Sequence, residues 1–210
     1  MKVLIIASHF DDEIIGCGGT LAKHIKKGDK VYVVFACGKV TDYIDRGLIE
    51  TRKKHAKKVA DLMGIEYIYI LDFPLIMLDT IPQYQIVCEL EKVIFIVKPD
   101  IIYTHNPYDI NSDHRVLCEA TLVWCRPVKN DFTREIYFYE TFGSTNGFQP
   151  NYYVDISNEM DKKVEALSVY TTEINVQTRT IDTIRNVASY RGMEINVSYA
   201  EAFSVYRSIK

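Results

Sequence analysis

Four side chains that bind metals or carry protons stand close together near the N-terminus: His9, Asp11, Asp12 and Glu13. They directly follow residues 3–7, an apolar run with the composition of a strand buried on both faces. A helix start needs one capping carboxylate rather than such a cluster. The pattern therefore predicts a chemical site at the end of the first strand.

A second polar segment, residues 105–115, follows another buried apolar run at residues 101–104. Its polar side chains include His105, Asn111, Asp113 and His114. Open α/β sheets bind ligands at the carboxyl ends of their strands, where the strand order reverses. If the first and fourth strands are neighbours, as in the common order, we expect His9, Asp12 and His114 to converge there.

This set of side chains has the composition of a catalytic zinc site, in which two imidazoles and one carboxylate leave a coordination position open. Adjacent Asp11 and Asp12 do not easily present the same face at a tight turn. One can bind the metal while the other faces the water, whose pKa zinc lowers from about 15.7 to about 7. A carboxylate beside that water can accept its proton as a carbonyl is attacked.

The elements that position these residues alternate between strands and helices. Apolar runs predict strands, and amphipathic stretches ended by glycine, or opened by Pro82, predict helices. The predicted strands are residues 3–7, 31–36, 67–71 and 101–104, and the helices between them end near residues 27, 63 and 97. This order indicates an α/β fold, a Rossmann-like parallel sheet with helices on both faces.

After residue 127 the regular alternation of strands and helices ends. The sequence there predicts weak strands at 136–140 and 153–156, a helix from Ser157 to Tyr170 and a second helix over residues 180–190. We predict one domain, residues 1–210, with a Rossmann-like body at 1–126 and a small C-terminal α+β extension at 127–210 that acts as a cap.

Composition narrows the function further. A net charge of −3 and a pI near 6.0 provide no basic surface for nucleic acid, so none is expected as a partner. The apolar runs are too short for a membrane span or a signal peptide. Five cysteines, an odd number without a C-x-x-C pair, favour reduced thiols in a cytoplasmic protein.

The motif His9-Phe10-Asp11-Asp12-Glu13, followed by Gly-Cys-Gly-Gly-Thr and later by Asn111-Ser112-Asp113-His114-Arg115, resembles the PIG-L/LmbE family of zinc-dependent de-N-acetylases. The resemblance implies a Rossmann-like fold and removal of N-acetyl groups from amino sugars or their derivatives, in a sugar-nucleotide or surface-polysaccharide pathway, with acetate released. It implies one zinc ion per chain. Because relatives often form oligomers, it also implies a homo-oligomer. By motif it assigns the metal to His9, Asp12 and His114, the general base to Asp11, and an orienting role to Asp113.

Three positions differ from the family pattern or extend it. Asn111 stands where the family often has a histidine, and its amide can donate a hydrogen bond to substrate but not a proton. His105 is then the nearest substitute as the catalytic acid, with Asp11 acting as both base and acid as the other possibility. Arg52 resembles the family's arginine that holds anionic groups of the substrate.

Two other classes of function remain open at this point. A non-catalytic Rossmann-like protein could bind a nucleotide or sugar with Gly16 to Gly19 near a phosphate, although these glycines do not form G-x-G-x-x-G. A magnesium-dependent phosphohydrolase could use the acidic cluster. Two histidine ligands favour zinc over magnesium, which prefers oxygen.

Overall fold

The computed structural model describes residues 1–41, 46–128, 131–145, 147–174 and 179–209. A seven-stranded sheet runs through the molecule in the order β3-β2-β1-β4-β5-β7-β6. The predicted neighbourhood of the first and fourth strands is confirmed, because Val3 to Ile5 of β1 pair in parallel with Ile101 to Tyr103 of β4. The strands are β1 (Lys2–Ala7), β2 (Lys30–Phe35), β3 (Tyr67–Ile70), β4 (Ile101–His105), β5 (Glu135–Tyr139), β6 (Tyr152–Asp155) and β7 (Ala200–Ser208).

The C-terminal strands extend this same sheet. β5 continues the parallel arrangement beside β4, whereas β7 runs antiparallel between β5 and β6. The sequence pattern did not predict β7. Its second residue, Glu201, is a buried acid that interrupts the apolar run, so periodicity alone does not reveal the strand.

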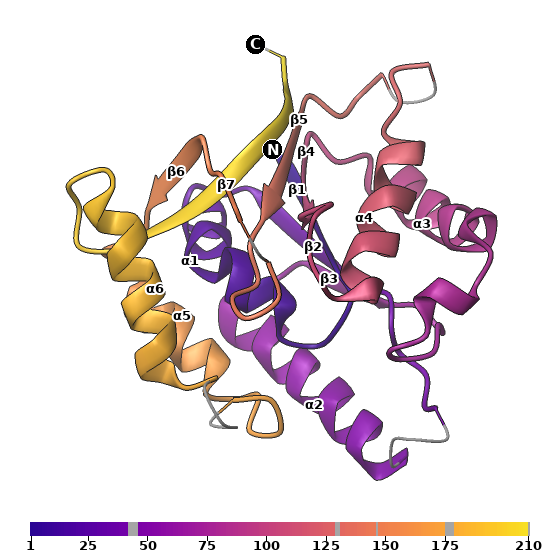
Figure 1. The fold of residues 1–210 in the computed structure, drawn as a ribbon, viewed down its shortest axis with the longest axis horizontal. Coiled ribbons are helices and arrows are strands. Elements are labelled where there is room, and N and C mark those ends of the chain that lie inside the picture. The colour runs from indigo at the N-terminus through magenta and orange to yellow at the C-terminus, as the bar shows by residue number, and fades with distance from the viewer. Residues whose placement is uncertain (42–45, 129–130, 146, 175–178, 210) are drawn as a thin grey trace.

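Helices cover both faces of the sheet (Figure 1). Alternate residues of β1 mark the two cores: Val3 and Ile5 pack on the side of α1, α2, α5 and α6, and Leu4 and Ile6 pack on the side of α3 and α4. This alternation is why the strand is apolar throughout. The helices are α1 (Asp12–Lys26), α2 (Arg46–Met63), α3 (Gln83–Val97), α4 (Ser112–Trp124), α5 (Met160–Leu167) and α6 (Ile181–Met193), with a short 3-10 helix at Leu78–Thr80.

The start of α5 differs from the prediction. Ser157 does not cap the helix, because its backbone N–H and its hydroxyl both donate to Oδ1 of Asp155 in a turn that ends β6. The helix begins at Met160 and ends at Leu167, so it is shorter than the predicted span to Tyr170. The turn after it carries Tyr170 into the core, where the side chain is fully buried.

Three glycines let α1 pack tightly against its neighbours. A Cβ atom at Gly16 would lie 2.3 Å from Cδ2 of Tyr139 on β5, and one at Gly19 would lie 2.6 Å from Cγ2 of Ile156. A Cβ at Gly18 would meet Ile14 and Lys163. The glycines therefore serve packing in the body of α1, and the reading of this segment as a phosphate cradle is wrong.

Candidate active site

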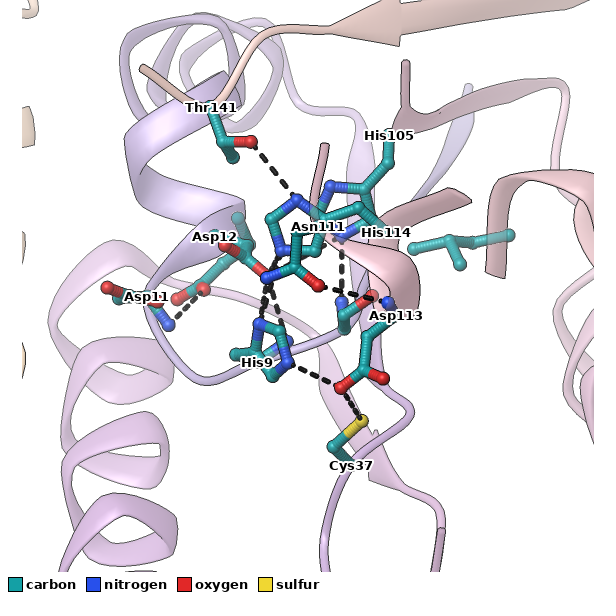
Figure 2. A network of polar contacts seen from close by, with 12 residues as sticks. His9, Asp11, Asp12, Cys37, His105, Asn111, Asp113, His114 and Thr141 are labelled. Atoms are coloured by element: carbon teal, nitrogen blue, oxygen red, sulfur yellow. Dashed lines mark hydrogen bonds and ion pairs between the residues drawn. The ribbon is translucent and has the colours of Figure 1, made fainter. Parts of the chain in front are cut away.

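The carboxyl ends of β1 and β4 bring the two polar segments together, as the sequence predicted. His9 lies in the turn after β1, Asp12 opens α1, and His114 lies in the first turn of α4. Figure 2 shows the three side chains pointing toward one another from these separate elements. Asp12 and His114 are buried, whereas the His9 side chain is 19% exposed, so the cluster opens to solvent on the side of His9.

The ligand atoms of this cluster form a small, nearly regular triangle. Nε2 of His114 lies 3.2 Å from Nδ1 of His9, and Oδ2 of Asp12 lies 3.3 Å from the His9 nitrogen and 3.4 Å from the His114 nitrogen. Ligands about 2.0–2.1 Å from a tetrahedral zinc ion are roughly 3.3–3.4 Å apart, so the spacing fits one ion bound by all three atoms. The donor set and its geometry both fit the predicted metal.

The second nitrogen of His9 has a fixed partner. Nε2 of His9 lies 2.9 Å from Oδ2 of Asp113, which is fully buried. Backbone N–H groups of Ile76 and Leu78 donate to the two oxygens of the same carboxylate, at 2.8 and 3.0 Å. A carboxylate that accepts from a metal-binding histidine fixes its tautomer and its ring orientation. Asp113 thus holds the His9 ring in one orientation, and its part in catalysis stays a prediction.

The second nitrogen of His114 also has a carboxylate partner, one that the sequence reading missed. Oδ2 of Asp109 lies 3.1 Å from Nδ1 of His114. The hydroxyl groups of Thr141, Ser144 and Thr145, from the loop after β5, also donate to this oxygen. Asp109 was visible in the polar segment, but nothing in the sequence placed the hydroxyl groups beside it. Both histidines therefore have the carboxylate support typical of metal ligands.

The charges around the cluster favour a bound cation. Burial alone would raise the pKa of Asp12, but the facing imidazole of His114 holds that pKa well below its ordinary value. Burial lowers the pKa of His114, yet Asp12 and Asp109 outweigh it and raise this pKa to about 9. A site that draws protons onto its imidazoles offers the negative charge that a divalent ion needs.

Asp11 sits at the edge of the cluster in an unusual backbone conformation (Figure 2). Its φ of 135° lies in a region that residues other than glycine rarely adopt, and its side chain is buried. Such strain persists where the surrounding structure holds it, and it is common at functional sites. Here Oε2 of Glu13 accepts from the Asp11 backbone N–H at 3.1 Å, and Nη1 of Arg179 donates to Oδ2 of Asp11 at 3.0 Å.

The surroundings of Asp11 also alter its acidity. Burial and the neighbouring Asp12 raise the pKa of the Asp11 carboxyl well above its ordinary value, although Arg179 acts in the opposite direction. Arg179 was not predicted from the sequence. It lies in the α5–α6 connection, and no local motif links it to the first strand.

His105 lies behind the cluster rather than at its opening. Its imidazole is fully buried and stacks on His114, with ring centroids 3.9 Å apart. Nε2 of His105 accepts from the backbone N–H of Ser8 at 2.9 Å. Burial and the nearby His114 hold the pKa of His105 well below its ordinary value. Nδ1 of His105 is buried without a hydrogen-bond partner among the described residues. The enclosed position of the ring does not favour the predicted role as a proton donor, which stays a prediction.

Asn111 caps the helix that carries His114. Its Oδ1 accepts from the backbone N–H of Asp113 at 2.9 Å (Figure 2). The carbonyl oxygen therefore has a structural partner. The predicted donation to substrate depends on the amide nitrogen.

Arg52 is brought near the site but is already paired. Its guanidinium lies on α2 and forms an ion pair with Glu173, and both side chains are largely buried. A guanidinium held by a carboxylate has less to offer an anionic substrate group. The predicted anion-binding role is therefore not one that this arrangement favours.

Comparison with known proteins places this geometry in a family. The model of the PIG-L family, described as GlcNAc-PI de-N-acetylase, matches residues 4–125. The diacetylchitobiose deacetylase of Thermococcus kodakarensis is 30% identical over 223 aligned positions, covering 95% of this chain and 81% of that protein.

Solved structures agree with this assignment. The N,N'-diacetylchitobiose deacetylase of Pyrococcus horikoshii, in complex with an inhibitor, is 25% identical with a TM-score of 0.77, covering 98% of this chain and 84% of that one. The conserved protein TT1542 of Thermus thermophilus shares the fold with a TM-score of 0.82 at 23% identity, covering 99% of this chain and 96% of that one. The chain therefore belongs to the PIG-L family of de-N-acetylases, and it is an enzyme of the deacetylase class that hydrolyses amide bonds.

Proposed function

We propose that the chain is a zinc-dependent hydrolase that removes the acetyl group from an N-acetylated amino sugar and releases acetate. One observation carries the proposal: Nδ1 of His9, Oδ2 of Asp12 and Nε2 of His114 lie 3.2–3.4 Å from one another at the opening of the site. Three protein ligands with an open fourth position are typical of catalytic zinc. The two relatives named as diacetylchitobiose deacetylases support an N-acetylated sugar as substrate.

The ligand types favour zinc over the alternatives. When bound, zinc would act as a Lewis acid that polarises the acetyl carbonyl and makes water more acidic. Nitrogen from two imidazoles suits zinc, whereas magnesium prefers oxygen ligands and keeps its water. The carboxylates of Asp113 and Asp109 hold the two rings in the tautomers that leave Nδ1 of His9 and Nε2 of His114 free to bind.

Asp11 is the residue to which we assign proton transfer. It accepts the proton of the attacking water, which balances the first step, and returns that proton to the departing amine, which balances the second. Its buried carboxylate directly precedes Asp12 in the chain and does not belong to the ligand triangle. Because His105 is enclosed behind His114, we assign it a supporting role, and Asp11 then serves as both base and acid.

We infer that the substrate is a sugar such as N-acetylglucosamine, free, glycosidic or linked to a nucleotide, in a sugar-nucleotide or surface-polysaccharide pathway. We assign the amide nitrogen of Asn111 to contact the sugar, because Oδ1 is already bonded to the helix and the nitrogen is the remaining donor. Arg52 contributes only if its pair with Glu173 opens. None of the helices in the described part of the chain combines the length and apolar character needed to cross a membrane.

The test combines metal analysis with an acetate-release assay. Purified protein is assayed on N-acetylglucosamine, N,N'-diacetylchitobiose and a nucleotide-linked N-acetyl sugar. We expect one zinc per chain and acetate release, with Asp11→Asn keeping the zinc but losing activity. A protein that binds no zinc, or one that releases no acetate from the whole panel, would refute the proposal.

Three further expectations stay predictions. They are a cytoplasmic location, a homo-oligomeric state, and the division into a body at residues 1–126 and a cap region at 127–210. Analytical ultracentrifugation of the purified chain measures the second. Expression of residues 1–126 alone, followed by circular dichroism, measures the third.

A further inference from the structure

The carboxylate of Asp11 lies in a crowded acidic environment. It is buried, and the acids Asp12 and Glu13 directly follow it in the chain. Acidic neighbours do not attract a carboxylate, so a hydrogen-bond donor must fix its orientation. Among the residues that the structure describes, Arg179 is the one basic side chain paired with it.

We propose that Arg179 is a positioning residue for the deacetylation, and this proposal rests on the proposed role of Asp11. Nη1 of Arg179 donates to Oδ2 of Asp11 at 3.0 Å, which fixes that oxygen and leaves Oδ1 as the one that takes the proton. A guanidinium suits the task because its donors have a rigid, planar arrangement. The arginine side chain is 39% exposed, so it reaches the buried carboxylate from the rim of the site.

The neighbourhood of Arg179 supports a positioning role rather than a chance surface pair. Tyr170, on the other side of the same α5–α6 connection, donates its hydroxyl to Oε1 of Glu13 at 2.6 Å. Glu13 in turn accepts from the backbone N–H of Asp11. Asp11 is therefore held at two points. Arg179 contacts its side chain, and Tyr170 supports its strained backbone through Glu13.

Arg52 does not provide an equivalent contact. Its guanidinium pairs with Glu173 instead. The two arginines thus have separate partners. Arg52 neutralises a neighbouring acid, and Arg179 contacts the proposed base itself.

The first arm of the test measures catalysis with Arg179→Ala and Arg179→Lys. We expect Arg179→Ala to lower kcat by about 10–100-fold, the loss that removal of a hydrogen bond to a charged group typically causes, with KM and bound zinc little changed. Arg179→Lys should recover part of kcat, and free guanidinium should restore activity to Arg179→Ala but not to Asp11→Asn. Arg185→Ala is the matched control, because Arg185 lies on α6 and pairs with the exposed Asp161.

The second arm needs no activity. A double-mutant cycle with Asp11→Asn and Arg179→Ala compares urea denaturation midpoints. We expect the two changes to be non-additive, because each removes the same contact. Additive midpoints, an unchanged kcat, or a raised KM with kcat retained would each overturn the positioning role. The midpoints could be non-additive while the wild-type protein releases no acetate. That result would refute the proposed function and leave the Arg179–Asp11 pair intact.

Discussion

Two clusters of buried charge lie along α1, and they differ in how completely their members satisfy one another. Beside the middle of the helix, Nζ of Lys163 donates to Oε1 of Glu201 at 2.6 Å and to the carbonyl oxygen of Ile15 at 2.8 Å. The Glu201 carboxylate accepts from the backbone N–H groups of Gly19 and Thr20. This cluster is closed, because opposite charges meet and the remaining bonds go to the backbone.

The cluster at the N-terminus of α1 is open by comparison. The ligand atoms of His9, Asp12 and His114 face one another across 3.2–3.4 Å, although each of them has a lone pair to offer a cation. The outer atoms of the two histidines are bonded to Asp113 and Asp109. The comparison teaches that burial and charge alone do not mark a functional site. What marks it is a set of acceptors that converge on one point.

The largest expected effect comes from removing a ligand of the open cluster. His114→Ala deletes one of three proposed zinc ligands, so we expect bound zinc to be lost and acetate release to fall to background. Mass spectrometry under native conditions measures the zinc. His24→Ala is the matched control, since His24 lies on α1 and contacts Asp29 and Tyr103 instead. Stoichiometric zinc in His114→Ala would remove this residue from the metal site.

A substitution in the closed cluster should lower the free energy of unfolding without lowering the amount of bound zinc. Lys163→Met leaves the buried Glu201 carboxylate without its counter-charge, which typically costs about 3–5 kcal/mol of unfolding free energy. Urea denaturation measures this loss, and the folded fraction should still bind zinc. Lys162→Met is the control, because Lys162 forms only an exposed pair with Glu165, typically worth about 0.2–1 kcal/mol. Equal effects of the two changes would show that the cluster is not closed in solution.

An intermediate effect is expected from the carboxylates that hold the ligands. Asp109→Asn keeps the shape of the side chain but weakens its hold on Nδ1 of His114, so zinc affinity should fall about 10–100-fold. Competition with a chelator of known affinity measures the change. Asp79→Asn is the control, an acid in the 3-10 helix outside the cluster. If Asp109→Asn binds zinc as tightly as the wild type, then the second carboxylate does not support the ligand.

The same contrast explains which parts of the site could be predicted from the sequence. His9 and Asp12 lie in one short motif directly after a strand. The apolar runs predicted β1 and β4 as strands, and the common strand order of such sheets made them expected neighbours, so the convergence of the three side chains followed. Asp109 could be seen in the polar segment but not assigned, because its hydroxyl partners come from the loop after β5. Arg179 could not be found, because its contact with Asp11 joins residues that are 168 positions apart.

The same reasoning applies to the fold. The five parallel strands and their helices depend on local apolar patterns, whereas β7 contains Glu201, whose burial makes sense only once Lys163 stands opposite it. The enclosure of His105 could not be predicted for a related reason. A histidine at the end of a strand looks available in the sequence, and only the packing of His114 over it shows that the ring is enclosed.

The smallest expected effect concerns Asn111. Its side-chain oxygen caps α4, and its side-chain nitrogen has the proposed contact with substrate. Asn111→Ala removes the cap of α4 and should lower the unfolding free energy by about 0.5–2 kcal/mol. Asn111→Ser keeps a capping oxygen but lacks the amide nitrogen, so its stability should stay close to that of the wild type. If the nitrogen contacts the sugar, KM rises in both variants. If KM rises in Asn111→Ala alone, the residue acts through the helix and not through substrate, because only the variant that lost the cap is affected.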